Sequence, residues 1–266
     1  MSRVDKTRLR AAFSRGAAGY EARAVLQAEV ARRVESLAAG AAPRARRALD
    51  VGCGAGGLLA ALSARLPGLS ATGVDLSLGM ARLCRERLGP GAAVAGDAEN
   101  LPFRAGTFDL VVSTSALQWV AEIDRALSEI RRTLAPGGAV CLALFCGDTL
   151  WELRESWRAA LPAGVPAQTH TFLSATRLRS AMAEAGLPPA SLEVERRVAR
   201  HPSARDVLES LRAIGAGNAV AGRGGGLGLA RAVGEMSRLY AERHGRDGSV
   251  PATWEIAYAV ARAPER

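Results

Sequence analysis

Short apolar runs and longer amphipathic stretches follow one another along the chain from residue 48 onward. The apolar runs lack a regular alternation of polar and apolar residues, which is typical of parallel strands buried on both faces. Five strands are predicted in this region, at 47–52, 70–75, 92–96, 108–113 and 139–145. Helices are predicted between them at 58–66, 78–88 and 123–134, and the turn Pro136-Gly137-Gly138 ends the last of these. Alternating strands and helices predict a doubly wound α/β sheet.

The pattern differs on either side of this region. Two helices are predicted before it, at 4–15 and 20–39. After it, helices are predicted at 150–160, 175–185, 206–214 and 229–244, with a glycine-rich loop at 216–228. Two late strands, 191–200 and 252–261, alternate in polarity. They complete a predicted seven-stranded, mostly parallel sheet with a hairpin-like final pair, and the helical insertion 201–250 between them is long enough to cover a site.

We interpret residues 1–266 as one domain with three parts. These are an N-terminal helical lid (1–46), a cofactor-binding core (47–146) and a substrate side (147–266). No apolar run reaches the ~18 residues needed to cross a membrane, and the N-terminus lacks the apolar core of a signal peptide. The four cysteines show no metal-binding spacing and fit reduced thiols. We therefore expect a cytoplasmic protein.

The net charge of +9 is unevenly distributed. Residues 1–47 carry 11 basic and 4 acidic side chains, a net charge of +7, and Lys6 is the only lysine of the chain. One interpretation is genomic base composition, because alanine, glycine and arginine are abundant together. The other is a basic face for an acidic macromolecule, either a nucleic acid or an acidic carrier protein.

The strongest chemical signal is the stretch 48–57, with the sequence ALDVGCGAGG. A glycine turn between a strand and a helix lets the backbone approach a ligand, and the helix N-terminus offers free N–H groups. Gly52-x-Gly54-x-x-Gly57 fits the dinucleotide-binding pattern, whereas Gly52-x-Gly54-x-Gly56 fits the pattern of methyltransferases. Either match alone is weak evidence.

Three acidic residues help to separate these two possibilities. Asp50 would repel a pyrophosphate but suits a cationic group such as the amino group of S-adenosylmethionine. Asp75 ends the second strand and can accept both ribose hydroxyls, a role found with either cofactor. Asp97 follows the third strand and can meet an adenine amino group, with Ala98 and Leu101 against the ring. The alternatives are a structural hydrogen-bonding role for Asp50 and a turn or helix cap for Asp97.

At this point the chain resembles the class I S-adenosylmethionine-dependent methyltransferases. The motifs that carry the resemblance stand in order over residues 47–146 and read DVGCGAGG, GVD, GDAENLPF, FDLVVSTSALQW and LAPGGAVCLALF. The resemblance implies a Rossmann-like seven-stranded fold, S-adenosyl-L-methionine as cofactor and no metal. The cofactor-binding residues that it implies are Asp50, Gly52, Gly54, Gly56, Asp75, Leu76, Asp97, Ala98, Ser113 and Gln118.

The flanking segments are similar to those of the malonyl-acyl-carrier-protein O-methyltransferases of biotin synthesis. The similar segments read RLRAAFSRGAAGYEARAVLQ, SALQWV, TLWELRESW, LRAIGAGN and VPATWEIAYAVAR. Residues 221–228, AGRGGGLG, depart from the family pattern because they are unusually rich in glycine. The resemblance implies methylation of the free carboxylate of a malonyl thioester, carried on an acidic acyl-carrier protein or on coenzyme A, to the methyl ester that starts biotin synthesis. It implies neither a nucleic-acid nor a membrane partner.

A carboxylate is already an anion at neutral pH, so this reaction needs no general base. Catalysis should then consist of positioning and exclusion of water. Arg154 is the candidate that would bind the substrate carboxylate, because arginine binds carboxylates through two parallel hydrogen bonds. Tyr20 is a candidate lid residue near the methyl group and substrate, and Trp119 a candidate substrate wall. The structural alternatives are a solvated helix arginine, a core tyrosine and a packing tryptophan.

The basic N-terminal segment gives the acidic carrier protein a predicted docking site. The candidate residues are Arg8, Arg10, Arg15 and Arg23.

Three other functions remain open. The first is methylation of a small lipophilic acceptor such as a quinone precursor, which requires the same core motifs. The second is a non-catalytic cofactor- or RNA-binding protein, which the low aromatic content of 5% disfavours. The third and least favoured is an NAD-dependent dehydrogenase.

Overall fold

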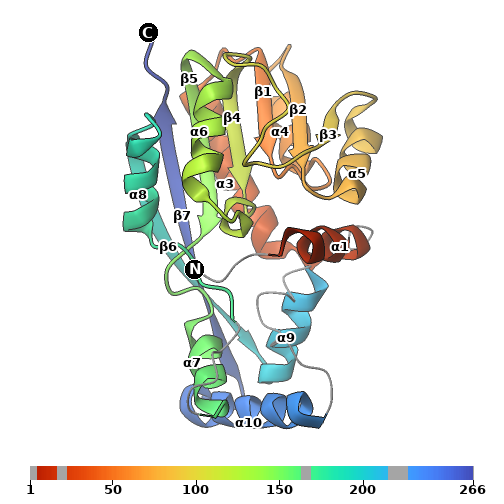
Figure 1. Ribbon diagram of the computed structural model, residues 1–266, viewed down its shortest axis with the longest axis vertical. Helices are drawn as coiled ribbons and strands as arrows, with labels where there is room; N and C mark the ends of the chain where they lie inside the picture. The colour runs from red at the N-terminus through yellow and green to blue at the C-terminus, as the bar shows by residue number, and fades with distance from the viewer. Residues whose placement is uncertain (1–4, 17–22, 163–168, 215–226, 266) are drawn as a thin grey trace.

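The computed structural model describes residues 5–16, 23–162, 169–214 and 227–265 of the chain (Figure 1). Seven strands form one sheet in the order β3-β2-β1-β4-β5-β7-β6. The strands are β1 (Arg47–Val51), β2 (Ser70–Asp75), β3 (Ala93–Ala95), β4 (Phe108–Thr114), β5 (Leu134–Phe145), β6 (Pro189–His201) and β7 (Val250–Arg262). Strand β7 runs antiparallel to both of its neighbours, β5 and β6, and the other described pairs are parallel. The predicted seven-stranded, mostly parallel α/β sheet with a final hairpin-like pair is confirmed.

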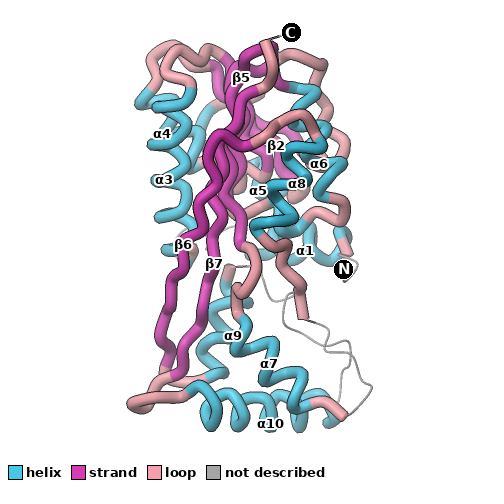
Figure 2. The backbone as a smooth tube through the Cα atoms, turned by 90° about the vertical axis from the view of Figure 1, so that its left-hand side faces the viewer, coloured by secondary structure: helices cyan, strands magenta, loops and turns pink. Residues whose placement is uncertain are grey.

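Helices cover both faces of this sheet. The described helices are α1 (Lys6–Gly16), α3 (Val25–Ala41), α4 (Gly57–Arg65), α5 (Leu78–Leu88), α6 (Ile123–Thr133), α7 (Trp151–Ala160), α8 (Ala175–Glu184), α9 (Ala204–Ala213) and α10 (Leu227–His244), with a short 3₁₀ helix η2 (Leu117–Trp119). Figure 2 shows α3 and α4 on one side of the strands and α6 and α8 on the other. Each side encloses its own hydrophobic cluster.

Strand β5 shows why the central strands lack a polar face. Its residues Ala139, Cys141 and Ala143 point to the cluster beneath α3, where small side chains let that helix pack closely. Val140 and Leu142 point to the cluster beneath α6 and α8. All of these residues are buried. The strand is therefore apolar on both faces, as expected for the centre of a parallel sheet.

Two sequence predictions need correction. Strand β5 begins at Leu134 rather than at residue 139. Its pairing with β4 skips from Leu134 to Ala139, so Pro136-Gly137-Gly138 forms an irregularity inside the strand and not a turn before it. Strand β6 is an edge strand whose Val194 and Val198 are 48% and 54% exposed, so its apolar residues are not buried as the alternation suggested.

The remaining helices lie beyond the carboxyl ends of the central strands. In Figure 1, α1 lies across these strand ends, and α7, α9 and α10 gather around the far part of β6 and β7. Helices α9 and α10 form the described part of the predicted helical insertion, whereas most of its glycine-rich loop lies outside the described residues. No described helix is long and apolar enough to cross a membrane.

Candidate active site

The glycine turn between β1 and α4 is held by its surroundings. Gly52, Gly54 and Gly56 all have positive φ angles, of 82°, 52° and 81°, which favour glycine over other residues. A Cβ atom on Gly52 would overlap the side chain of Ala116, and one on Gly56 would lie 2.7 Å from the sulfur of Cys84. Gly52 and Gly54 line a pocket, whereas Gly56 packs against α5. Gly56 therefore has a packing reason to be glycine, and its predicted contact with the cofactor stays a prediction.

The carboxylate of Asp75 links the glycine turn to the start of α5. One of its oxygens accepts the N–H of Gly54 at 3.0 Å and the other accepts the N–H of Ser77 at 2.8 Å. Burial raises the pKa of Asp75, and these two hydrogen bonds oppose that shift. Each oxygen keeps a lone pair, so the carboxylate can also accept hydrogen bonds from two hydroxyl groups of a ligand.

Asp97 forms the opposite end of the same pocket, where α1 meets the segment after β3. Its Oδ1 accepts the N–H of Glu99 at 3.0 Å, and its Oδ2 lies 2.6 Å from Nζ of Lys6. Lys6 also lies 2.7 Å from Oε2 of Glu99. Burial alone would lower the pKa of Lys6, but hydrogen bonds to the two carboxylates raise it above its ordinary value. Lys6 was not among the residues predicted from the sequence.

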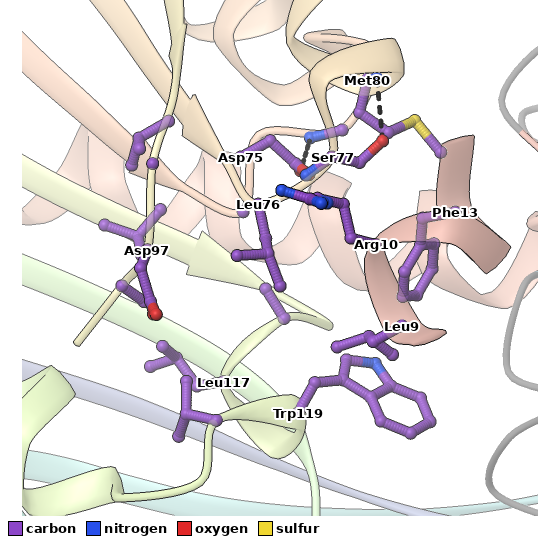
Figure 3. Close-up of a pocket in the computed structure, with 18 of the residues that line it drawn as sticks. Leu9, Arg10, Phe13, Asp75, Leu76, Ser77, Met80, Asp97, Leu117 and Trp119 are labelled. Atoms are coloured by element: carbon purple, nitrogen blue, oxygen red, sulfur yellow. Dashed lines mark hydrogen bonds between the residues drawn. The ribbon is translucent and has the colours of Figure 1, made fainter. Parts of the chain in front are cut away.

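These residues surround what we name the cofactor pocket. This pocket is partly open to solvent. The lining residues that were predicted from the sequence are Gly52, Gly54, Asp75, Leu76, Asp97 and Ala98. Figure 3 shows Asp75, Leu76 and Asp97 along one side of the pocket, while Leu9, Arg10 and Phe13 of α1 approach it from another.

A second pocket, the Asp50 pocket, adjoins the first at Gly52 and Gly54. It lies between the glycine turn and α3, whose Gln27 and Ala31 line it. Asp50 is 1% exposed, and its Oδ1 has no hydrogen-bond partner among the described residues. Burial raises the pKa of this carboxyl well above its ordinary value. A buried carboxylate oxygen without a partner is unfavourable unless a cation or donor joins it, so the Asp50 pocket fits the amino group of S-adenosylmethionine.

A third pocket, the aromatic pocket, lies on the other side of Ser115. Its lining residues are Phe13, Gln27, Ser115, Gln118, Trp119, Phe145, Leu150, Phe172, Leu211, Ile214 and Trp254. The Nε2 of Gln118 donates to the carbonyl of Ser115 at 2.7 Å, and its Oε1 has no partner among the described residues. Gln118, predicted to bind the cofactor, is therefore placed in the aromatic pocket. Ser115 is shared by all three pockets.

Known proteins match both the core and the full length of the chain. A family model described as a methyltransferase domain matches residues 49–142. A malonyl-[acyl-carrier protein] O-methyltransferase of Geobacter sulfurreducens is 43% identical over 265 residues, covering 97% of this chain and 99% of the relative. The chain belongs to the malonyl-[acyl-carrier protein] O-methyltransferase family.

Another family member is similar over most of its length, and solved structures share the fold. The family member from Laribacter hongkongensis is 36% identical over 98% of this chain and 90% of its own length. A putative methyltransferase from Bacillus halodurans has the same fold, with a TM-score of 0.62 at 19% identity, over 88% of this chain and 98% of its own. The chain is thus a methyltransferase with the fold that its motifs predicted.

Three predicted residues of this methyltransferase lie away from the cofactor pocket or outside the described chain. The hydroxyl of Ser113 donates to the carbonyl of Val51 at 2.7 Å, so it joins β4 to β1 and lines none of the three pockets. This bond gives Ser113 a structural role, and its predicted contact with the cofactor stays a prediction. Arg154 donates to the carbonyls of Thr149 and Gly147, and burial lowers its pKa. Its role as carboxylate ligand stays a prediction. Tyr20 lies outside the described residues.

The guanidinium of Arg154 nevertheless lies near the aromatic pocket of the methyltransferase. Its central carbon is 5.9 Å from the ring centre of Phe172, which lines that pocket. Phe172 also contacts His170, whose ring packs against Trp119 with a centroid distance of 4.8 Å. Burial lowers the pKa of His170 to about 4, so this imidazole is neutral at pH 7. Trp119 is thus both a pocket wall and part of an aromatic stack.

The predicted docking arginines of the methyltransferase differ in position. Arg8 is exposed on α1 and lies 3.4 Å from Asp5. Arg10 lines the cofactor pocket, and Figure 3 shows its side chain reaching toward Ser77. Arg23 is exposed just before α3, and the side chain of Arg15 lies outside the described part of the chain. Arg8, Arg10 and Arg23 are all exposed, and Arg10 also lines the cofactor pocket.

Proposed function

We propose that this methyltransferase moves the methyl group of S-adenosyl-L-methionine onto the free carboxylate of a malonyl thioester on acyl-carrier protein. The product is the malonyl methyl ester that starts biotin synthesis. One observation carries the proposal. Ser115 joins two carboxylate-lined pockets to an aromatic pocket, in a chain 43% identical over its length to a protein named for this reaction.

The three aspartates divide the recognition of the cofactor between them. Asp50 would hold the amino group, Asp75 the ribose hydroxyls and Asp97 the adenine amino group. All three ligand groups are hydrogen-bond donors, which suits carboxylates as acceptors. When bound, S-adenosylmethionine supplies a methyl group from a positively charged sulfur and leaves as S-adenosylhomocysteine, so a carboxylate becomes an ester with no proton gained or lost.

The aromatic pocket binds the malonyl group and excludes water from it. Phe145, Phe172 and Trp254 provide apolar walls. A carboxylate held against such walls loses hydrogen bonds to water and becomes a better nucleophile. No base is needed, since the acceptor oxygen carries no proton at neutral pH. Arg154, behind Phe172, is proposed to attract the carboxylate, and Tyr20 to close the site.

The carrier protein is proposed to be acidic and to dock near α1. The net charge of +7 on residues 1–47 and the exposure of Arg8 and Arg23 support this proposal. Coenzyme A could present the same malonyl thioester without a protein surface. We also propose a cytoplasmic location, supported by four cysteines that are all free and buried.

Turnover of two acceptors tests the proposal against its main alternative. Purified protein is given S-adenosylmethionine with either malonyl-carrier protein or a lipophilic quinol, and S-adenosylhomocysteine release is followed. The proposal expects release with malonyl-carrier and background release with the quinol. Release with the quinol alone would replace the malonyl acceptor with a small lipophilic one.

A further inference from the structure

The backbone of Ser115 has an unusual conformation. Its φ angle is +52°, in the left-handed region that a residue with a side chain rarely adopts and that glycine adopts freely. Both backbone polar groups of Ser115 are fixed: its N–H donates to the carbonyl of Ala143 at 2.8 Å, and its carbonyl accepts Nε2 of Gln118 at 2.7 Å. Contacts from β5 and η2 therefore maintain the strained conformation, as is common at functional sites.

The side chain of Ser115 has a free hydroxyl. Its Oγ is buried and has no hydrogen-bond partner among the described residues. Ser113, two residues earlier, offers a contrast, because its Oγ is paired with the carbonyl of Val51. A buried hydroxyl without a partner is unfavourable. Ser115 thus combines a strained backbone with an unsatisfied polar group, at a position shared by all three pockets.

We propose that the Ser115 hydroxyl donates a hydrogen bond to the acceptor carboxylate and holds it where the aromatic pocket meets the cofactor pockets. This inference rests on the proposed function and adds the residue that touches the acceptor. A neutral donor suits this task, because it orients the carboxylate while withdrawing less electron density from it than a cation would. Gln118 contributes by fixing the Ser115 backbone from the same pocket.

Two substitutions separate the hydroxyl from the backbone conformation. Ser115→Ala removes the hydroxyl and keeps the strained conformation, whereas Ser115→Gly removes the hydroxyl and relieves the strain. Both variants should lower kcat for malonyl-carrier about 10- to 100-fold, as expected for loss of one positioned donor. Both should bind S-adenosylhomocysteine within about twofold of wild type by isothermal titration calorimetry. The glycine variant should melt at a higher temperature than the alanine variant.

Three results would overturn the proposal for Ser115. The first is a Ser115→Ala variant with wild-type kcat and KM. The second is a loss of S-adenosylhomocysteine affinity as large as the loss of kcat, which would assign the hydroxyl to the cofactor. The third is recovery of kcat in Ser115→Gly, which would show that only the backbone matters. A wild-type protein that forms no malonyl methyl ester would instead contradict the proposed function itself and, with it, the acceptor assigned to Ser115.

Discussion

The ammonium group of Lys6 lies 2.6 Å from the carboxylate of Asp97 and so connects α1 to the far end of the cofactor pocket. It also lies 2.7 Å from the carboxylate of Glu99, which accepts the N–H of Ala121 at 2.6 Å. Further along the helix, the hydroxyl of Ser14 lies 2.8 Å from that of Ser77. Helix α1 is therefore fastened to the rim of the cofactor pocket at two points.

Removal of the Lys6 charge should weaken cofactor binding. Asp97 and Glu99 share this cation, and without it their carboxylates repel each other and the position of Asp97 is less fixed. We expect Lys6→Met to lower the affinity for S-adenosylhomocysteine about tenfold in calorimetry at low salt. Lys6→Arg, which keeps the charge, is the matched control and should lose less. Equal affinity of wild type and Lys6→Met would contradict a role for α1 in cofactor binding.

Substitution of Asp50 should raise stability while weakening binding. The pKa of Asp50 is raised in the folded protein by burial, so the stability contributed by its protonated form is present at low pH and lost as pH rises through the folded-state pKa. Asp50→Asn removes this pH-dependent loss. Its melting temperature should exceed that of wild type, by a margin that grows with pH up to that pKa.

The same variant should bind S-adenosylhomocysteine about 10- to 100-fold more weakly, because the amino group of the ligand loses its anionic partner. Calorimetry and melting curves on one preparation provide both measurements. An Asp50→Asn protein that is less stable than wild type and binds with unchanged affinity would assign Asp50 to the structural role considered for it from the sequence.

Substitution of Arg154 should change both the melting temperature of the protein and its KM for malonyl-carrier. Arg154→Gln loses the charged hydrogen bonds to Gly147 and Thr149, so the melting temperature should fall. If Arg154 also attracts the substrate carboxylate, KM for malonyl-carrier should rise about fivefold or more with little change in kcat. A lower melting temperature with unchanged KM would leave Arg154 with only the task of holding the loop before α7.

Charge reversal on α1 tests the proposed carrier docking. Arg8→Glu should raise KM for malonyl-carrier about three- to tenfold at low ionic strength, and added salt should reduce the difference because exposed charges are screened. Arg179→Glu is the matched control, since Arg179 is exposed on α8. Equal effects of the two reversals would show that net charge matters and not a docking face on α1.

The grouping of three aspartates at adjoining pockets could be predicted because their signal is local. Asp50 and Asp75 stand at the ends of parallel strands, and the carboxyl ends of such strands meet at one edge of a sheet. Asp97 follows the next strand in the same way. The pattern of strands and the spacing of the aspartates were therefore enough to predict that these side chains lie close together.

The acceptor side could not be predicted in the same way. Phe13, Phe145, Phe172 and Trp254 come from four distant parts of the chain, and only the packing of α1 and of the hairpin around β7 brings them together. The conformation of Ser115 depends on a bond from β5, so no local motif reveals it. The Pro136-Gly137-Gly138 turn signal was misleading for a similar reason, because pairing with β4 continues past it.

The mass of the carrier protein shows directly whether the malonyl group has been methylated. Malonyl-carrier protein is incubated with this methyltransferase and S-adenosylmethionine labelled in its methyl group, and the intact carrier is analysed by mass spectrometry before and after mild alkaline hydrolysis. The carrier should gain one labelled methyl group, and alkaline hydrolysis should release that label as methanol, as expected of a methyl ester. An unlabelled carrier, or a labelled carrier that yields no labelled methanol on hydrolysis, would contradict methylation of the malonyl carboxylate.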